Sequence, residues 1–328
     1  MIFPPIIKEN DTIGVAAPSS GEGGDLAAYE LSLSQLKKAG FQIIETASVR
    51  NVESPSNTAK ARVQEWMQLW NNPEVQYILS AKGGDFLEEI LPLLDWETIV
   101  KRPLWVQGYS DNTGLLFPLT TKYDIATVYG PNACGFDMTR LDPSLEITMD
   151  YMKGNFREQQ SFEKYQLGWG EGVDGYDLNT PVVYELPNGP VDVTGRLIGG
   201  CLDVLQFLIG TPYEDVKGFI KRYQDDGIVW FFDIFAMKAE DVAHTLWAMK
   251  QAGWFEHTKA IIVGRVCFPG SMMDMSYAEA FLRVLGTEIP MVLNADVGHV
   301  KPMWTMVNGA MCHLSCANGK GSIKQWMD

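Results

Sequence analysis

Short apolar runs alternate with amphipathic segments through the first half of the chain. Runs rich in Val, Ile, Leu and Ala that are bounded by Gly, Pro, Asn or Ser predict buried strands. Segments with apolar residues three or four positions apart predict helices. The alternation is typical of α/β proteins, in which helices cover both faces of a mostly parallel sheet and ligands bind beyond the carboxyl ends of its strands. The predicted strands are residues 12–17, 41–46, 75–80, 104–107 and 127–129, and the predicted helices are residues 26–39, 59–70 and 86–94.

Residues 155–180 interrupt this alternation. They are rich in Gly, Glu, Gln and Asp, which indicates a linker or an exposed segment beside the substrate. The alternation resumes at residues 194–208, so a chain of 328 residues is expected to hold two domains. The second set of predicted elements comprises strands at 228–232, 260–266 and 291–294 and a long helix at 239–252. We therefore divide the chain into an N-terminal domain at 1–158, a linker or substrate-side segment at 159–190 and a C-terminal domain at 191–328.

The negative charge of the chain limits the partners that it can have. A formal net charge of −15 without a visible basic face argues against nucleic acid, and it disfavours anionic membranes. The N-terminal residues lack the pattern of a secretory signal, and no stretch approaches the roughly 20 apolar residues of a membrane span. We expect a cytoplasmic protein that acts on a small molecule.

The cysteines give little support for a metal centre. Five are present, an odd number, and most lie in apolar surroundings, so we expect buried free thiols. Cys312, His313 and Cys316 form a C-H-x-x-x-C pattern, but this pattern lacks the second pair of ligands that a structural zinc site needs. No metal is therefore predicted.

A serine stands where the strand at 104–107 is expected to turn into a helix. Ser110 lies at the tip of this turn, followed by Asp111, Asn112 and Thr113, which can cap the helix. A sharp turn of this kind exposes the hydroxyl next to unpaired helix N–H groups, which can stabilise an oxyanion. Ser110 is thus a candidate nucleophile, although the same pattern also fits a serine with only a capping role.

A nucleophilic serine needs a base and a group that orients the base. His299 lies in a Gly- and Pro-bearing loop after an apolar run, a suitable place for proton transfer, whereas His244, His257 and His313 fit surface or packing positions. Asp233 ends the apolar run at 228–232 and must pair with something, either a catalytic base or a buried backbone or arginine group.

Two glycines follow the strand at 75–80. Gly83 and Gly84 permit positive φ and let backbone N–H groups approach a ligand, although a plain tight turn would use them too. The sequence contains neither a dinucleotide-binding fingerprint nor a Walker pattern.

These motifs, in this order, resemble those of the LD-carboxypeptidase and microcin C immunity-protein family of serine peptidases. The resemblance covers most of the chain, and the ordered set is far more specific than any one motif. It rests on TIGVAAPSS, AKARVQEWMQLWNNPEVQYILSAKGGDFLEEILPLLD, GYSDNTGLL, YGPN, GRLIGGCLDVLQFLIGTPYE, GIVWFFDIF, LWAMKQAGWF, IIVGR and VGHVKPMWTMVNGA.

The resemblance implies a fold and a catalytic triad. The fold would be an N-terminal, doubly wound, mostly parallel sheet like that of class I glutamine amidotransferases, followed by a smaller C-terminal α/β swivelling domain. Ser110 matches the family nucleophile and His299 the family base, and the N–H groups of Gly84 and Asp111 match the oxyanion hole. The family acid falls at Asp233, where the family has glutamate.

Three residues depart from the family pattern. Asp233 is one methylene shorter than glutamate, and a misplacement of about 1 Å could cost on the order of 10²-fold in rate. Lys82 replaces a commoner arginine, and Cys201 replaces the usual asparagine. These departures bear on rate and substrate more than on fold.

The resemblance implies two substrate classes, and it implies no metal or organic cofactor. One class is a muropeptide that loses a terminal D-alanine; the other is an aminoacyl or peptidyl nucleotide, which the sequence favours slightly. Lys82, Gly83 and Trp169 are expected to bind substrate, Trp169 by stacking on a purine unless it packs on its own domain. A homodimer is also implied.

Other readings of the same sequence remain open. A binding protein on this scaffold with weakened catalysis would also fit the aspartate at 233, and a serine hydrolase of different specificity would fit the triad. The α/β-hydrolase fold fits less well, because GYSDN lacks the second glycine of G-x-S-x-G.

Overall fold

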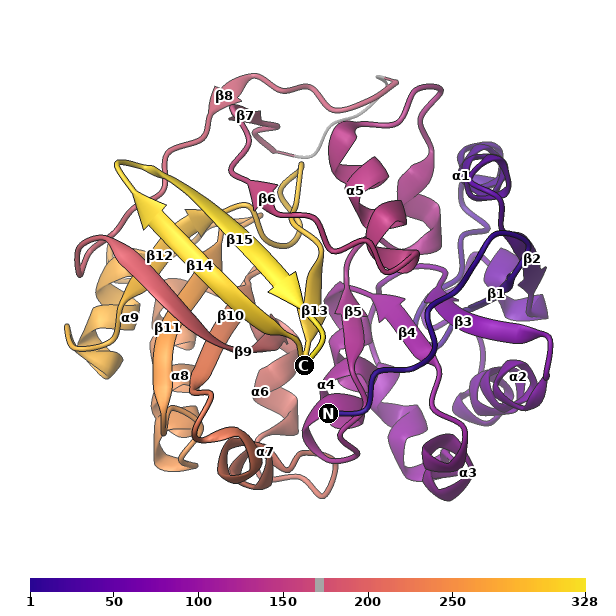
Figure 1. Cartoon of the computed structure of the whole chain (residues 1–328), viewed down its shortest axis with the longest axis horizontal. Helices are drawn as coiled ribbons and strands as arrows, with labels where there is room; N and C mark the ends of the chain where they lie inside the picture. The colour runs from indigo at the N-terminus through magenta and orange to yellow at the C-terminus, as the bar shows by residue number, and fades with distance from the viewer. Residues whose placement is uncertain (169–173) are drawn as a thin grey trace.

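The computed structural model describes residues 1–168 and 174–328, which form two large sheets side by side and one sheet of two short strands (Figure 1). The N-terminal sheet has the strand order β13-β5-β4-β3-β1-β2. Strands β1 to β5 are parallel, whereas β13 comes from near the end of the chain and pairs with β5 in the antiparallel sense. The strands are β1 (Thr12–Ala16), β2 (Gln42–Glu45), β3 (Val75–Ser80), β4 (Trp105–Gly108), β5 (Thr127–Tyr129) and β13 (Met306–Asn308).

Helices and short 3₁₀ turns connect these strands. The α-helices are α1 (Leu26–Lys38), α2 (Ala59–Asn71), α3 (Trp96–Lys101), α4 (Thr113–Thr121) and α5 (Pro143–Met152), and the 3₁₀ turns are η1 (Ala47–Arg50), η2 (Leu87–Leu93), η3 (Ser110–Asn112) and η4 (Ala133–Phe136). The segment predicted as a helix at 86–94 is the 3₁₀ turn η2. Pro92 lies within it and has no N–H to donate, which is one reason why an α-helix does not continue there.

The second sheet has the order β12-β11-β10-β9-β14-β15-β6. Its first four strands are parallel and the last three pair in the antiparallel sense. The strands are β9 (Val191–Cys201), β10 (Ile228–Asp233), β11 (Thr258–Gly264), β12 (Met291–Ala295), β14 (Met311–Ala317), β15 (Lys320–Trp326) and β6 (Gln159–Gln160), and the helices are α6 (Leu202–Leu208), α7 (Val216–Tyr223), α8 (Ala239–Gln251) and α9 (Tyr277–Leu285). The predicted α/β class is therefore confirmed.

The two large sheets with their helices form the two lobes of the molecule, and the described residues of the segment that connects them include strands. They supply β6 at the edge of the second sheet and the two-stranded sheet of β7 (Lys164–Tyr165) and β8 (Thr180–Pro181). The division of the chain at residues 158 and 190 stays our proposal, and the returning strand β13 belongs to the first sheet even though it lies beyond both boundaries.

Helix α4 joins the cores of the two lobes. All of its residues are buried, and Figure 1 shows it between the two sheets. Phe117 of α4 stacks on Trp254, with ring centroids 5.3 Å apart, and lies 6.3 Å from Trp230 of β10. Because α4 follows directly on η3, the turn that begins at Ser110, the same packing fixes the candidate nucleophile relative to the second lobe.

Candidate active site

Ser110 stands at the strand-to-helix turn that the sequence predicted. It follows β4 and Tyr109, and its φ of +63° is uncommon for a residue other than glycine. A Cβ atom on Gly83 would lie only 3.1 Å from Ser110 Oγ, so glycine lets the loop after β3 approach the hydroxyl closely. The serine is partly exposed, as a nucleophile must be.

The residues after Ser110 do not cap α4, and that prediction was wrong. Asn112, the residue before α4, makes no side-chain hydrogen bond to the helix; its amide donates to the carbonyls of Lys82 and Tyr109. Asp111 Oδ2 accepts from Ser19 Oγ at 2.5 Å and from the N–H of Leu87 at 3.2 Å. These side chains hold the loop after β3 against the turn that carries Ser110.

Thr113 and Asp111, which flank Asn112, also contribute to the structure around Ser110. Thr113 Oγ1 accepts a hydrogen bond from the N–H of Cys201 at 2.9 Å, which links the start of α4 to the end of β9. Burial raises the pKa of Asp111 to about 6, although its bond from Ser19 favours the charged form.

His299 reaches Ser110 from the other lobe. It lies in the loop between β12 and β13, and its Nε2 is 3.0 Å from Ser110 Oγ. The imidazole is buried between the rings of Tyr109 and Phe235, whose centroids lie 5.1 and 4.6 Å away. These contacts restrict the imidazole to the orientation that faces the hydroxyl.

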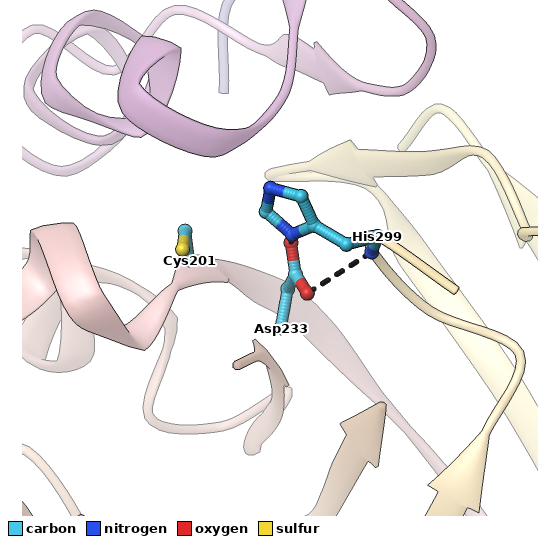
Figure 2. Close-up of side chains that lie close together, drawn as sticks. All are labelled: Cys201, Asp233 and His299. Carbon is cyan, nitrogen blue, oxygen red and sulfur yellow. Dashed lines mark hydrogen bonds and ion pairs between the residues drawn. The ribbon is translucent and has the colours of Figure 1, made fainter. Parts of the chain in front are cut away.

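Asp233 lies behind His299 and is wholly buried at the end of β10. One of its oxygens, Oδ1, accepts from the backbone N–H of His299 at 3.2 Å, the contact that Figure 2 marks with a dashed line. Gly298 has a φ of +90°, and a Cβ atom there would lie 1.9 Å from this oxygen. Only glycine therefore allows the loop to approach the carboxylate so closely.

The contact between the carboxylate and the imidazole is close but not well aligned. Asp233 Oδ2 lies 2.8 Å from His299 Nδ1, yet Nδ1 lacks a partner with hydrogen-bond geometry among the described residues. Burial opposes ionisation of Asp233, but the nearby His299 and the hydrogen bonds from His299 and Tyr129 outweigh it and hold the pKa of Asp233 below its usual value. Asp233 is thus ionised and lies beside the imidazole. The sequence predicted that this buried acid would have a partner, and the partner is His299.

Tyr129 belongs to the site although we did not single it out in the sequence. Its hydroxyl donates to Asp233 Oδ2 at 2.5 Å and accepts from the backbone N–H of Ser110 at 3.2 Å. A single buried hydroxyl therefore bridges the acid in one lobe and the nucleophile in the other. The available signal was its place at the end of β5, on the sheet edge that also carries Ser110.

A cavity of about 760 Å³ opens over Ser110 and His299. Gly83, Gly84 and Asp111 line it, as does the partly exposed Lys82, whose Nζ lies 3.1 Å from Glu22. The structure thus brings all but one of the predicted site residues to one place. The exception is Trp169, which lies outside the described residues.

Cys201, one of the departures from the family pattern, also faces this cavity. It is the register partner of Asp233 on the neighbouring strand, and Figure 2 shows it beside the Asp233–His299 pair. Single ligand atoms of Cys201, Asp233 and His299 lie within 4.8 Å of one another, so these three side chains could hold a metal ion. All five cysteines are free.

Family models match both lobes of the chain. The model described as the LD-carboxypeptidase N-terminal domain matches residues 13–130, and the model of the C-terminal domain matches residues 194–314.

Individual relatives match over most of the chain. The microcin C7 self-immunity protein MccF of Escherichia coli is 28% identical over 88% of this chain and 86% of its own length. A probable murein peptide carboxypeptidase of Bacillus subtilis is 26% identical over 68% of this chain and 64% of its own. The solved structure of MccF in complex with aspartyl sulfamoyl adenosine is 25% identical, covers all of both chains and superposes with a TM-score of 0.82.

Proposed function

The chain belongs to the LD-carboxypeptidase family of serine peptidases, and we propose that Ser110, His299 and Asp233 are the residues with which it cleaves an amide bond. The observation that carries this assignment is the 3.0 Å contact between Ser110 Oγ and His299 Nε2, with Asp233 on the far side of the imidazole. This is the order of nucleophile, base and orienting acid that acyl transfer requires.

The reaction proceeds through an acyl-enzyme. His299 takes the proton of Ser110, and the serine oxygen attacks the amide carbonyl. The N–H groups of Gly84 and Asp111 stabilise the oxyanion, and His299 then protonates the leaving amine. Water hydrolyses the ester by the reverse sequence. Asp233 holds the imidazole and stabilises its charged form throughout, and no step needs a metal or an organic cofactor.

The shorter acid does not remove this capacity. Asp233 still reaches within 2.8 Å of Nδ1, and its other oxygen binds the backbone of the same histidine. Its negative charge therefore remains next to the imidazolium that forms during the reaction, which is the main demand on the acid.

For the substrate, we propose an aminoacyl or peptidyl nucleotide. Three apolar side chains from the two lobes line the cavity and remain exposed to solvent: Val52 (71% exposed), Phe86 (53%) and Phe207 (61%). Such a rim offers apolar surface on which the face of a planar nucleobase can stack. Lys82 can meet an anionic linkage beside it, and Gly83 leaves room for the substrate next to Ser110. The solved complex of MccF with aspartyl sulfamoyl adenosine agrees with this choice.

A muropeptide is the second candidate. It rests on the murein peptide carboxypeptidase of Bacillus subtilis, which matches about two thirds of this chain. A hydrolysis panel that sets aminoacyl sulfamoyl adenylates against L,D-linked muropeptides decides between the two classes. Turnover of the adenylate alone supports our first choice, and turnover of the muropeptide alone overturns it.

Labelling with a fluorophosphonate tests the catalytic assignment without any choice of substrate. Ser110 should label, Ser110→Ala should abolish the label, and His299→Ala should slow labelling greatly. Failure of the wild-type protein to label would instead favour a binding protein on this scaffold.

A homodimer and a cytoplasmic location complete the proposal. The family resemblance supports the dimer, and light scattering during gel filtration tests it. Within residues 1–168 and 174–328, no helix is long and apolar enough to cross a membrane. Five free thiols agree with a reducing compartment, and cell fractionation tests the location.

A further inference from the structure

The thiol, carboxylate and imidazole in the site come from three separate backbone segments. Cys201 ends β9, Asp233 ends the neighbouring β10, and the two residues are direct register partners in the parallel pair. His299 reaches both residues from the loop after β12 (Figure 2). Their exposed fractions are 1%, 0% and 7%, so the sheet and the surrounding core enclose all three side chains.

These side chains carry the ligand types of a zinc site. A thiolate, a carboxylate and an imidazole bind Zn²⁺ at about 2.3 Å for sulfur and about 2.0 Å for oxygen and nitrogen, so tetrahedral ligands lie about 3.3 to 3.6 Å apart. In the structure, one ligand atom from each residue lies within 4.8 Å of the other two. Side-chain movements of about 1 Å would therefore close the set around an ion.

Two further features favour an ion at this place. His299 Nδ1 is buried and lies 2.8 Å from Asp233 Oδ2 without an aligned hydrogen bond, so an ion at Nδ1 would replace an ion-pair contact rather than a well-formed hydrogen bond. Cys201 and His299 both line the cavity, which gives an ion a route of entry and room for a water as fourth ligand.

Asp203 supports the thiol from outside this set. It lies 3.7 Å from Cys201 Sγ, and its two oxygens accept N–H groups from residues 235–237. The S–H of Cys201 donates to Asp203 Oδ2, so Asp203 positions the thiol for as long as the thiol keeps its proton.

We propose that Cys201, Asp233 and His299 form an inhibitory site for a zinc-like divalent cation. When the ion binds, the Cys201 thiol releases its proton to solvent as the sulfur–metal bond forms, and the imidazole proton moves from Nδ1 to Nε2. The base can then no longer accept the proton of Ser110. The inhibitory part rests on the proposed function, whereas the binding part does not.

Binding is measured with Cd²⁺, whose thiolate complexes absorb in the ultraviolet. The wild-type protein should show a thiolate-to-cadmium band that saturates at one ion. Cys201→Ser should abolish the band, and His299→Ala should weaken binding at least about tenfold, as expected when a ligand is lost. Cys134→Ser is the matched control, because Cys134 lines the same cavity outside the cluster, and it should keep the band. A band that persists in Cys201→Ser, or no band in the wild type, overturns the site.

Inhibition is measured with Zn²⁺ and the fluorophosphonate. Zinc should protect Ser110 in the wild type and in Cys134→Ser, and protection of Cys201→Ser should need at least about tenfold more zinc. Equal protection of all three variants, or none of the wild type, overturns the inhibitory role. If Ser110 fails to label without metal, the proposed function fails, while the cadmium band still decides whether the site exists.

Discussion

Replacement of Tyr129 by phenylalanine isolates the hydroxyl that bridges the two lobes. The hydroxyl donates to Asp233 Oδ2 at 2.5 Å and accepts from the N–H of Ser110 at 3.2 Å, and phenylalanine keeps the ring. A hydrogen bond to a charged group contributes about 1.5 to 3 kcal/mol. If that contribution is realised in the transition state, where Asp233 faces an imidazolium, kcat should fall about 10- to 150-fold.

The pH profile separates this role from a general loss of structure. The hydrogen bond from Tyr129 is one of the contacts that hold the pKa of Asp233 below its usual value. Its removal raises that pKa, because the carboxylate form loses a donor. The acidic limb of kcat/KM should therefore move to higher pH in Tyr129→Phe, while KM changes little because the hydroxyl is buried behind the nucleophile.

Tyr184→Phe is the matched control. Tyr184 is also buried, and its hydroxyl donates to the carboxylate of Asp296 at 2.6 Å. Both variants should lose comparable stability in urea unfolding, but only Tyr129→Phe should lose the rate of fluorophosphonate labelling and shift the pH profile. Equal losses of labelling rate in the two variants, or a wild-type profile in Tyr129→Phe, would refute the reasoning.

Two further substitutions test the packing around Asp233, and a third tests the apolar side chains of the cavity. Gly298→Ala would put a Cβ atom 1.9 Å from Asp233 Oδ1 at a φ of +90°, so it should destabilise the protein by at least about 1 to 3 kcal/mol in urea unfolding and lower kcat. Asp233→Glu restores the family acid but adds a methylene to a fully buried position; it should cost about 1 to 3 kcal/mol and lower kcat, and a rise in kcat would contradict this. Phe207→Ala removes an exposed apolar side chain of the cavity and should raise KM for the adenylate several-fold without a change in Tm.

The sequence located the main groups of the site because their positions follow from local patterns. Ser110 lies in the turn after β4, Asp233 ends β10, and His299 lies in the Gly-bearing loop after β12. Such positions gather at one edge of a parallel sheet, and the family resemblance then supplied their roles. The triad assignment itself stays a proposal for the labelling experiment.

Contacts between distant segments were not visible in the sequence. Asp111 and Thr113 look like capping residues in the sequence. In the fold, however, their oxygens accept hydrogen bonds from distant donors instead of from the helix: Ser19 Oγ, the N–H of Leu87 and the N–H of Cys201. Tyr129 was missed for the same reason, since its partner Asp233 lies 104 positions further along the chain. The poor alignment at His299 Nδ1 depends on angles that no pattern of residues encodes.

The short strand β13 has a consequence for how the protein can be divided. It lies between β12 and β14 of the second sheet in the chain, yet it pairs with β5 and so completes the sheet that carries the nucleophile. A fragment that ends between the lobes would leave β5 as a bare edge, open to pairing with another molecule. Cleavage or truncation in the middle of the chain should therefore yield fragments that aggregate. The nucleophile and the base thus belong to one folding unit.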